Sequence, residues 1–277
     1  MIGAGGHRHA LVRRRRAAPG GVRVLLLHGL AGSPTVWEEF TRRAGAGVEV
    51  WEAVLPWGTE GDPVWSRDDD PADQVTRALD RVPGGADAIV AHSFAAGPAL
   101  EALVRRPEEH RPGAAVVVAP FYRAAPEDFR WQDAERYLNG FHRILEEGLR
   151  IAVGDRISPE LRAAMALRVR DRIGPYGWQQ FFGAYLRSPR LEVAALRLPV
   201  LVVAGADDIA APPDDARALA AALPDGRLRL LAGCGHFAMA ERPGPFADAV
   251  RALLAEALPG ARAALAATHQ FTPTHRS

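Results

Sequence analysis

Short apolar runs of strand length alternate with longer helix-patterned stretches from residue 21 to residue 258. This alternation is typical of a mostly parallel sheet that is covered by helices on both faces. It therefore predicts a chain of the α/β class. The strand-like runs cover residues 22–27, 48–55, 86–91, 114–119, 198–204 and 227–231.

Helix-patterned stretches follow most of these runs. The acidic run from Asp68 to Asp70 lies where negative charge favours the start of a helix. A solvated helix start accounts for this run, and a metal site is the alternative interpretation. The helix-patterned stretches cover residues 34–43, 71–82, 97–106, 213–223 and 245–258.

The interval 121–190 interrupts the alternation, because it offers helix patterns but no strand-like run of the same quality. We expect it to be inserted at the edge of the sheet where the strands end. The predicted organisation is a core made of residues 1–120 and 191–260, with residues 121–190 as a helical insertion. Residues 261–277 are Ala-rich and then polar, and we predict a frayed tail there.

Composition excludes several classes of partner. The 277 residues carry a formal net charge of +1, which argues against a protein built to bind nucleic acid. The run Arg13–Arg16 is interpreted as part of an exposed strand, with a nucleic-acid patch as the alternative. The single cysteine, Cys234, excludes an internal disulfide and a Cys-rich metal site. No apolar run approaches the ~20 residues of a membrane helix, so we expect a cytoplasmic protein with no membrane partner.

Ser93 lies between a predicted strand and a predicted helix, in the sequence Ala91-His92-Ser93-Phe94-Ala95. Taken alone, a serine at this place fits a helix cap. The stretch also resembles the nucleophile turn of the α/β-hydrolase fold superfamily, in which small residues flank a strained turn between strand and helix. The usual flanks are glycine, whereas both are alanine here.

Three more stretches resemble this family and occur in its order. Residues 28–32 (His-Gly-Leu-Ala-Gly) follow the first strand, as the oxyanion turn of the family does. Residues 205–208 follow a strand where the family places its acid, and residues 233–237 follow one where it places its base. The resemblance implies an oxyanion hole made by the backbone N–H groups of Leu30 and Phe94.

The resemblance also implies roles for three side chains: Ser93 as the nucleophile, His236 as the base and Asp208 as the acid. A serine hydroxyl is a poor nucleophile near neutral pH, so a histidine must accept its proton and a carboxylate must orient that histidine. The family spacing selects Asp208, with the neighbouring Asp207 as the alternative. Cys234 is an alternative nucleophile, and we interpret it as a buried packing residue.

Two features depart from the family pattern. Residues 56–61 (Pro-Trp-Gly-Thr-Glu-Gly) stand where relatives often carry Asp or Arg followed by Gly-His-Gly, so this loop is expected to line the pocket differently. The leading hairpin of the family must be short here, and we expect it to use the segment 10–16.

Aromatic residues are concentrated in the insertion, where residues 121–190 hold eleven of the chain's twenty. In the family, such an insertion is a helical cap over the nucleophile. We expect that a small cap cannot bury all of these rings, so that some face an apolar pocket. The residues predicted to bind the substrate are His28, Trp57, Phe121, Trp131, Phe181 and Phe182.

These inferences together predict a serine hydrolase that cleaves an ester or thioester of a small hydrophobic or aromatic compound through an acyl-Ser93 intermediate. No cofactor and no metal are expected. Two alternatives stay open at this point: a cofactor-free lyase, cyclase or perhydrolase of the same fold, and a protein that binds a ligand in this pocket without turning it over.

Overall fold

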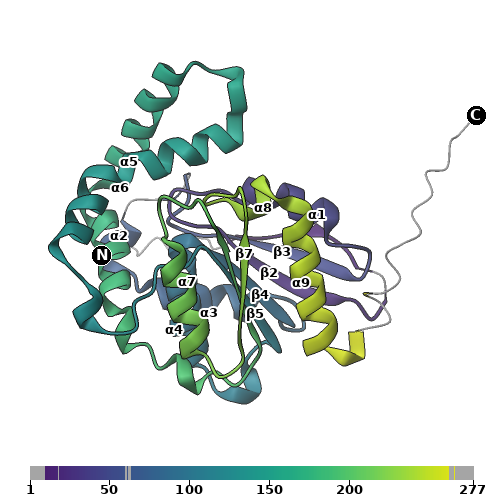
Figure 1. The fold of residues 1–277 in the computed structure, drawn as a ribbon. Helices are drawn as coiled ribbons and strands as arrows, with labels where there is room; N and C mark the ends of the chain where they lie inside the picture. Colours follow the sequence, from purple (N-terminus) through teal and green to yellow (C-terminus); the bar gives the residue numbers. More distant parts are fainter. Residues whose placement is uncertain (1–9, 18, 60, 62–63, 262–264, 266–277) are drawn as a thin grey trace, which may run out of the picture.

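The structure is a computed structural model that describes residues 10–17, 19–59, 61, 64–261 and 265. Its centre is a sheet of seven strands in the order β1-β3-β2-β4-β5-β6-β7 (Figure 1). Only the pair β1 and β3 is antiparallel, and every other neighbouring pair is parallel. The strands are β1 (Ala10–Arg15), β2 (Val22–Leu27), β3 (Val48–Val54), β4 (Ala88–His92), β5 (Ala114–Val118), β6 (Val200–Gly205) and β7 (Gly226–Leu231).

Helices cover both faces of this sheet, which confirms the predicted α/β class. On one face lie α1 (Glu38–Arg43) and α9 (Pro243–Ala257), and on the other lie α3 (Pro71–Arg81), α4 (Ala96–Arg105) and α7 (Pro213–Ala222) (Figure 1). The short helices are α2 (Trp65–Asp68) and α8 (Ala238–Glu241).

Strand β2 shows why the apolar runs predicted this arrangement. Side chains alternate between the faces of a strand, and both faces of β2 are apolar. Leu25 and Leu27 belong to the hydrophobic cluster under α3 and α4, whereas Val24 and Leu26 belong to the cluster under α1 and α9. All four are fully buried. A strand of this kind is stable only between two layers of helices.

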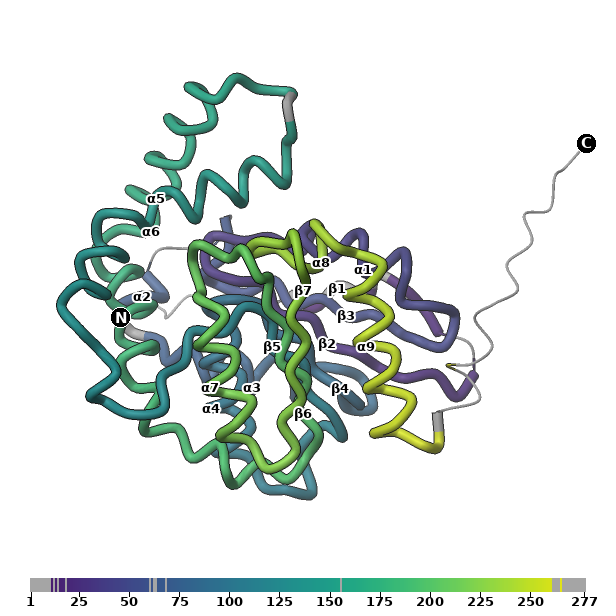
Figure 2. The backbone as a smooth tube through the Cα atoms, in the orientation of Figure 1, coloured from purple at the N-terminus to yellow at the C-terminus, as the bar shows by residue number. Residues whose placement is uncertain are grey.

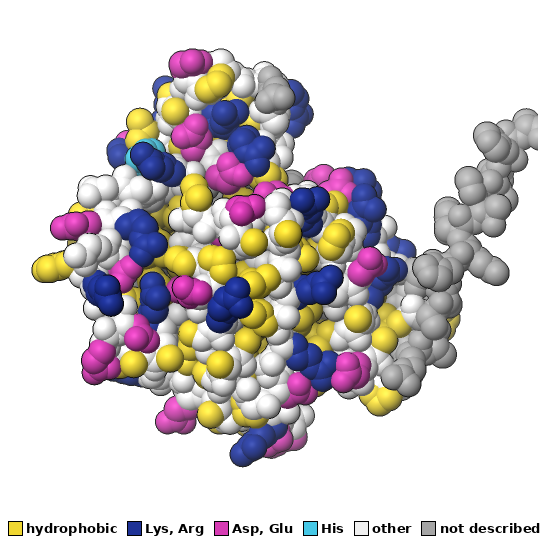
Figure 3. Space-filling model, viewed as in Figure 1, with side chains coloured by type: hydrophobic (Ala, Val, Ile, Leu, Met, Phe, Trp, Pro, Cys, Tyr) yellow, Lys and Arg dark blue, Asp and Glu magenta, His cyan; other side chains and the backbone are white. Residues whose placement is uncertain are grey.

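The interval between β5 and β6 forms two long helices, α5 (Trp131–Val153) and α6 (Pro159–Arg187). They pack against each other, and the end of α5 and the start of α6 project from the body as a helical hairpin (Figure 2). Helix α6 is interrupted at Gly174, which has a non-helical φ of 66°. The next residue is Pro175. Figure 3 shows charged side chains of both signs on the hairpin and on the body of this face.

The first strand differs from the expected hairpin. β1 does not pair with β2 but runs antiparallel to β3, at the edge of the sheet. The reason is that β3 and β4 occupy both edges of β2, so β1 cannot pair with β2 and pairs with the outer edge of β3 instead. The guanidinium of Arg13 lies 5.4 Å from the centre of the Trp51 ring, and Arg15 donates a hydrogen bond to the Thr41 carbonyl.

The predicted tail, residues 261–277, lies outside the described residues except for positions 261 and 265. Leu265 is buried against the cluster under α1 and α9. Among the helices that the structure describes, none is both long and apolar enough to span a bilayer.

Candidate active site

Ser93 occupies a tight turn between β4, which ends at His92, and the helical residues that follow. Its φ of 57° lies in the left-handed region, which costs a non-glycine residue about 1–2 kcal/mol. The flanking Ala91 and Ala95 are fully buried, so larger side chains would not fit there. A Cβ atom on Gly29 would lie 2.9 Å from the Ser93 Cβ. The glycine therefore lets the preceding loop approach the serine.

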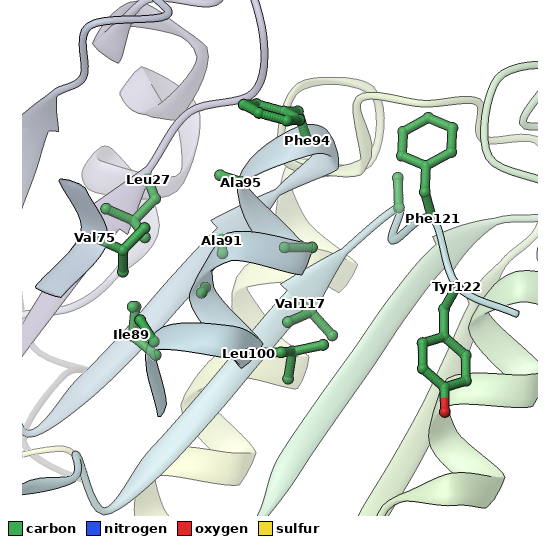
Figure 4. Packing of buried hydrophobic residues seen from close by; sticks show 14 of the residues in the cluster. Leu27, Val75, Ile89, Ala91, Phe94, Ala95, Leu100, Val117, Phe121 and Tyr122 are labelled. Atoms are coloured by element: carbon green, nitrogen blue, oxygen red, sulfur yellow. The ribbon is translucent and has the colours of Figure 1, made fainter. Parts of the chain in front are cut away.

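The core under this turn holds it in place (Figure 4). Phe94 and Ala95 lie just beyond the end of the strand that carries Ile89 and Ala91. The Phe94 ring packs against two tryptophan rings, with centroid distances of 5.2 Å to Trp57 and 6.0 Å to Trp65. The serine thus projects from a turn whose next residue is anchored in the core.

A serine, a histidine and an aspartate form one hydrogen-bonded line at the carboxyl ends of β4, β6 and β7. The Nε2 atom of His236 lies 2.8 Å from the Ser93 Oγ atom. The Nδ1 atom of His236 lies 2.8 Å from the Asp208 Oδ2 atom. His236 and Asp208 are buried. This arrangement allows Nδ1–H to donate to the carboxylate while Nε2 accepts a proton from the serine.

The second oxygen of Asp208 is also held. Its Oδ1 atom accepts hydrogen bonds from the backbone N–H groups of Ala210 at 2.7 Å and Ala211 at 2.9 Å. Burial works against ionisation of this carboxyl, but the His236 ring and the two N–H groups outweigh burial and hold its pKa below the usual value. Asp208 is therefore a carboxylate whose three hydrogen bonds fix its plane.

The structure distinguishes between the two aspartates that the sequence left as candidates for the acid. The side chain of Asp207 is exposed, and its backbone N–H donates to the Cys234 carbonyl. Asp208 alone faces His236. The two loops meet closely, since a Cβ atom on Gly205 would lie 2.1 Å from the Gly235 carbonyl oxygen. Burial raises the pKa of the Cys234 thiol to about 12, so this residue stays protonated.

Glu241 and His92 brace the backbone around His236, and the sequence analysis assigned neither of them this role. The Glu241 carboxylate accepts the N–H groups of Gly235 and Phe237, which flank the histidine, both at 2.9 Å. The Nε2 atom of His92 lies 2.9 Å from the His236 carbonyl oxygen, to which it donates. Glu241 lies four residues after Phe237 and six after Gly235, so a carboxylate at this spacing from the Gly-rich turn was the local signal that could have indicated the contact.

The loop after β2 approaches Ser93 with a free backbone N–H group. The N–H of Ala31 donates to the Trp57 carbonyl and that of Gly32 to the Gly29 carbonyl. Among the described residues, the N–H of Leu30 has no such partner. The N–H of Phe94 lies in the first turn of the helical segment, where intrahelical acceptors are lacking. These are the two groups predicted to bind an oxyanion.

His28 lies beneath this loop and does not line the pocket around Ser93. Its Nε2 atom accepts the N–H of Leu55, and its carbonyl accepts the Trp57 indole N–H. Burial lowers the pKa of His28 to about 4 and that of His92 to about 3. Both rings are therefore neutral near pH 7 and serve as fixed hydrogen-bonding groups.

The pocket that contains Ser93 encloses about 540 Å³ between the sheet edge and the projecting hairpin. Most of the hairpin side chains that face it are aliphatic. They come from the second half of α5 and from α6, and they are Ile144, Leu145, Leu149, Ile151, Ala152 and Val169. Phe237, next to the histidine, supplies an aromatic ring. Within the described residues, no three His, Cys, Asp or Glu side chains are grouped so that they could hold a metal ion.

This lining corrects the expectation of an aromatic pocket. None of the six residues predicted to bind the substrate, including His28, lines the pocket around Ser93. Trp131 is 81% exposed, and Trp57 borders a smaller neighbouring pocket of about 250 Å³. Phe121, Phe181 and Phe182 pack in an aromatic cluster that also contains Tyr137 and Tyr185. The rings bury one another, mostly edge to face, which the count of aromatics did not anticipate.

Residues 24–249 match the sequence model of the alpha/beta hydrolase family. The chain is 31% identical, over 273 residues and 95% of its length, to the polyketide synthase ThaQ of Burkholderia thailandensis. It spans only 13% of the length of that protein.

Solved structures share the fold at low identity. A 2-hydroxy-6-oxo-6-phenylhexa-2,4-dienoate hydrolase from Rhodococcus sp. strain RHA1 superposes with a TM-score of 0.66 at 19% identity, covering 89% of this chain and 99% of that one. A thioesterase domain from the curacin biosynthetic pathway gives a TM-score of 0.58 at 17% identity, covering 90% of this chain and 96% of that one.

The two neutral histidines predict a loss of stability in acid. Below pH 6.5 the unfolded chain takes up protons on His28 and His92, whereas the folded chain does so only near pH 4 and below. The free energy of unfolding should therefore fall by at least about 2 kcal/mol between pH 6.5 and pH 4.5. Urea titrations at the two pH values measure it, and His92→Gln should reduce the difference. An equal pH dependence in that variant would contradict the assignment.

Proposed function

We propose that this chain, which belongs to the alpha/beta hydrolase family, is a serine hydrolase that cleaves an ester or thioester of an aliphatic acid. The observation that carries the proposal is the unbroken hydrogen-bonded line from Asp208 through His236 to Ser93. A serine hydroxyl in contact with an oriented, buried imidazole is the arrangement that acyl transfer requires.

In the proposed mechanism, the Ser93 oxygen attacks the carbonyl carbon while its proton passes to His236 Nε2. The N–H groups of Leu30 and Phe94 bind the oxyanion that forms. Collapse of this intermediate expels the alcohol or thiol, which takes the proton from His236, and leaves acyl-Ser93. Water then attacks the acyl group, with His236 accepting its proton and returning it to the serine. Asp208 holds the histidine in the required tautomer throughout.

The pocket supports an aliphatic acyl group rather than an aromatic one. Its hairpin wall consists of Ile144, Leu145, Leu149 and their neighbours, while most aromatic rings of residues 121–190 are packed elsewhere. The similarity to a polyketide synthase and the shared fold with a thioesterase domain support a thioester of a polyketide-like chain as the substrate. We therefore propose hydrolytic release of such a chain as the reaction.

Ser93 should be the sole residue labelled by a fluorophosphonate, because among the described residues its hydroxyl is the one that contacts Nε2 of His236. Mass spectrometry of the labelled protein checks this, and Ser93→Ala should abolish both labelling and turnover. Full labelling of Ser93→Ala would refute the proposed nucleophile.

Asp208→Asn should lower kcat by about 10⁴, the loss expected when a triad carboxylate becomes an amide. The matched variant Asp207→Asn should retain activity.

The aliphatic wall predicts the effect of acyl chain length. Each added methylene contributes about 0.8 kcal/mol when buried, so kcat/KM should rise close to fourfold per methylene from acetate upward until the pocket is full. Both p-nitrophenyl esters and N-acetylcysteamine thioesters should show the trend, measured by release of nitrophenol or thiol. A flat series near background would exclude this function and favour a lyase, a cyclase or a binding protein. A branched or linear chain should outperform a phenylacetyl group of similar size.

Glu241→Gln should lower kcat by about tenfold while KM changes less than twofold. The amide keeps the size of the side chain, but its NH₂ group cannot accept the backbone N–H of Gly235 or Phe237, so the loop that carries His236 loses one of its fixed points. Steady-state kinetics measure the split. Glu256→Gln, which removes a carboxylate from an exposed ion pair with Arg227, is the control and should leave both constants unchanged. Equal losses in the two variants would argue against the bracing role.

A further inference from the structure

We infer that Tyr137 on α5 is a positioning residue for Asp208. This inference rests on the proposed function, since it assigns the tyrosine a role in orienting the acid of the triad. Tyr137 does not touch the reacting atoms. It acts through the backbone of the loop that follows β6.

A chain of hydrogen bonds connects the tyrosine to the carboxylate. The Tyr137 hydroxyl donates to the Ala210 carbonyl oxygen at 2.9 Å. The N–H groups of Ala210 and Ala211 donate to Asp208 Oδ1. Asp208 Oδ2 is thereby left to His236. The Ala210 carbonyl and the Ala211 N–H belong to one peptide group, so the tyrosine hydroxyl fixes the same peptide group whose N–H binds the carboxylate.

Burial makes this contact difficult to replace. Tyr137 is 2% exposed, and Ala210 and Ala211 are 1% exposed. Water cannot easily reach the Ala210 carbonyl when the hydroxyl is removed, so the carbonyl would stay unpaired or the loop would move. Burial also raises the pKa of Tyr137, which keeps the hydroxyl a donor across the working pH range.

The loop needs an external anchor, whereas the tyrosine is rigid. Between β6 and α7 the chain forms only turns and bends, and Ile209 within it is 67% exposed. Tyr137 is held by neighbouring rings, with centroid distances of 5.8 Å to Phe121 and 5.7 Å to Phe181. A side chain locked by packing can hold an irregular loop at a defined position, which is what orientation of a catalytic group requires.

The same helix connects this anchor to the substrate pocket. Ile144 lies seven residues after Tyr137, about two helical turns along α5. The first half of α5 therefore fixes the loop of the acid, and the second half forms the wall of the pocket. This placement accounts for a buried polar contact between the loop after β6 and a helix whose second half lines the pocket of Ser93.

The test compares Tyr137→Phe with Tyr122→Phe. Both variants keep the ring and lose the hydroxyl of a buried tyrosine in the same hydrophobic cluster. Among the described residues, the Tyr122 hydroxyl makes no hydrogen bond, whereas the Tyr185 hydroxyl interacts with Tyr137 and Asp215, so Tyr122 is the matched control. Three quantities are measured for each protein: the rate of Ser93 labelling by a fluorophosphonate, the downfield proton resonance of His236 Nδ1–H, and the melting temperature.

Tyr137→Phe should be labelled about tenfold more slowly than the wild type, and its Nδ1–H resonance should shift upfield or broaden, because the carboxylate is no longer held against the ring. Tyr122→Phe should match the wild type in both readouts. A lower melting temperature with unchanged labelling and an unchanged resonance in Tyr137→Phe would overturn the inference, because it would show a packing role only.

The two proposals fail in different ways. If the wild type is not labelled at Ser93, the proposed function fails, and the resonance still reports whether Tyr137 positions Asp208 against His236. If the wild type is labelled and Tyr137→Phe is labelled equally fast, only the inference about Tyr137 fails.

Discussion

The parallel arrangement of the buried strands is the constraint on which the other features of this molecule depend. Because β4, β6 and β7 run in the same direction, their carboxyl ends open at one edge of the sheet. The loops that leave this edge carry Ser93, Asp208 and His236, which lie far apart in sequence but meet within hydrogen-bond distance. Since both faces of the sheet are covered, the strands cannot shift without exposing an apolar layer. The rigidly packed core thus fixes the positions of these three loop residues.

The polar groups around Ser93, His236 and Asp208 are paired by hydrogen bonds, which leave the surrounding loops little freedom to move. Neutral His28 and His92 provide hydrogen bonds beneath the loops without adding charge. Glu241 uses both carboxylate oxygens on the loop of the histidine, and Asp208 uses both of its own on the histidine and the following turn. Buried groups that are fully paired stabilise one arrangement over its alternatives. The left-handed φ of Ser93 is tolerated because this surrounding network determines the position of the turn.

Local features of the sequence were sufficient to predict the class of fold and the three residues that meet at the edge of the sheet. A strand that ends before Ser93 and a Gly-rich turn around His236 are visible within a few positions, because the chemistry and the backbone conformation are both local. The edge position of β1 could not be predicted locally, because it depends on the pairing of β2 with β3 and β4 on its two edges. Glu241 contacts the loop of His236 locally, over four to six residues, but lies outside the motif that was recognised, whereas Tyr137 reaches the loop of Asp208 only through a tertiary contact. The aromatic residues of the insertion were counted correctly but placed wrongly, since composition does not say whether rings pack on one another or face a cavity.

Helix α5 shows how an insertion can become part of the site that it covers. An added hairpin that only closed the pocket could vary freely, and its contacts with the core would be apolar and replaceable. The buried hydrogen bond from Tyr137 to Ala210 is different, because it has one donor, one acceptor and no access for water. A change in the packing of α5 would therefore be transmitted to the loop of Asp208 as well as to the wall around Ile144. The shape of the pocket around Ser93 and the orientation of Asp208 are thus constrained together, and substitutions that enlarge the pocket must leave the first half of α5 in place.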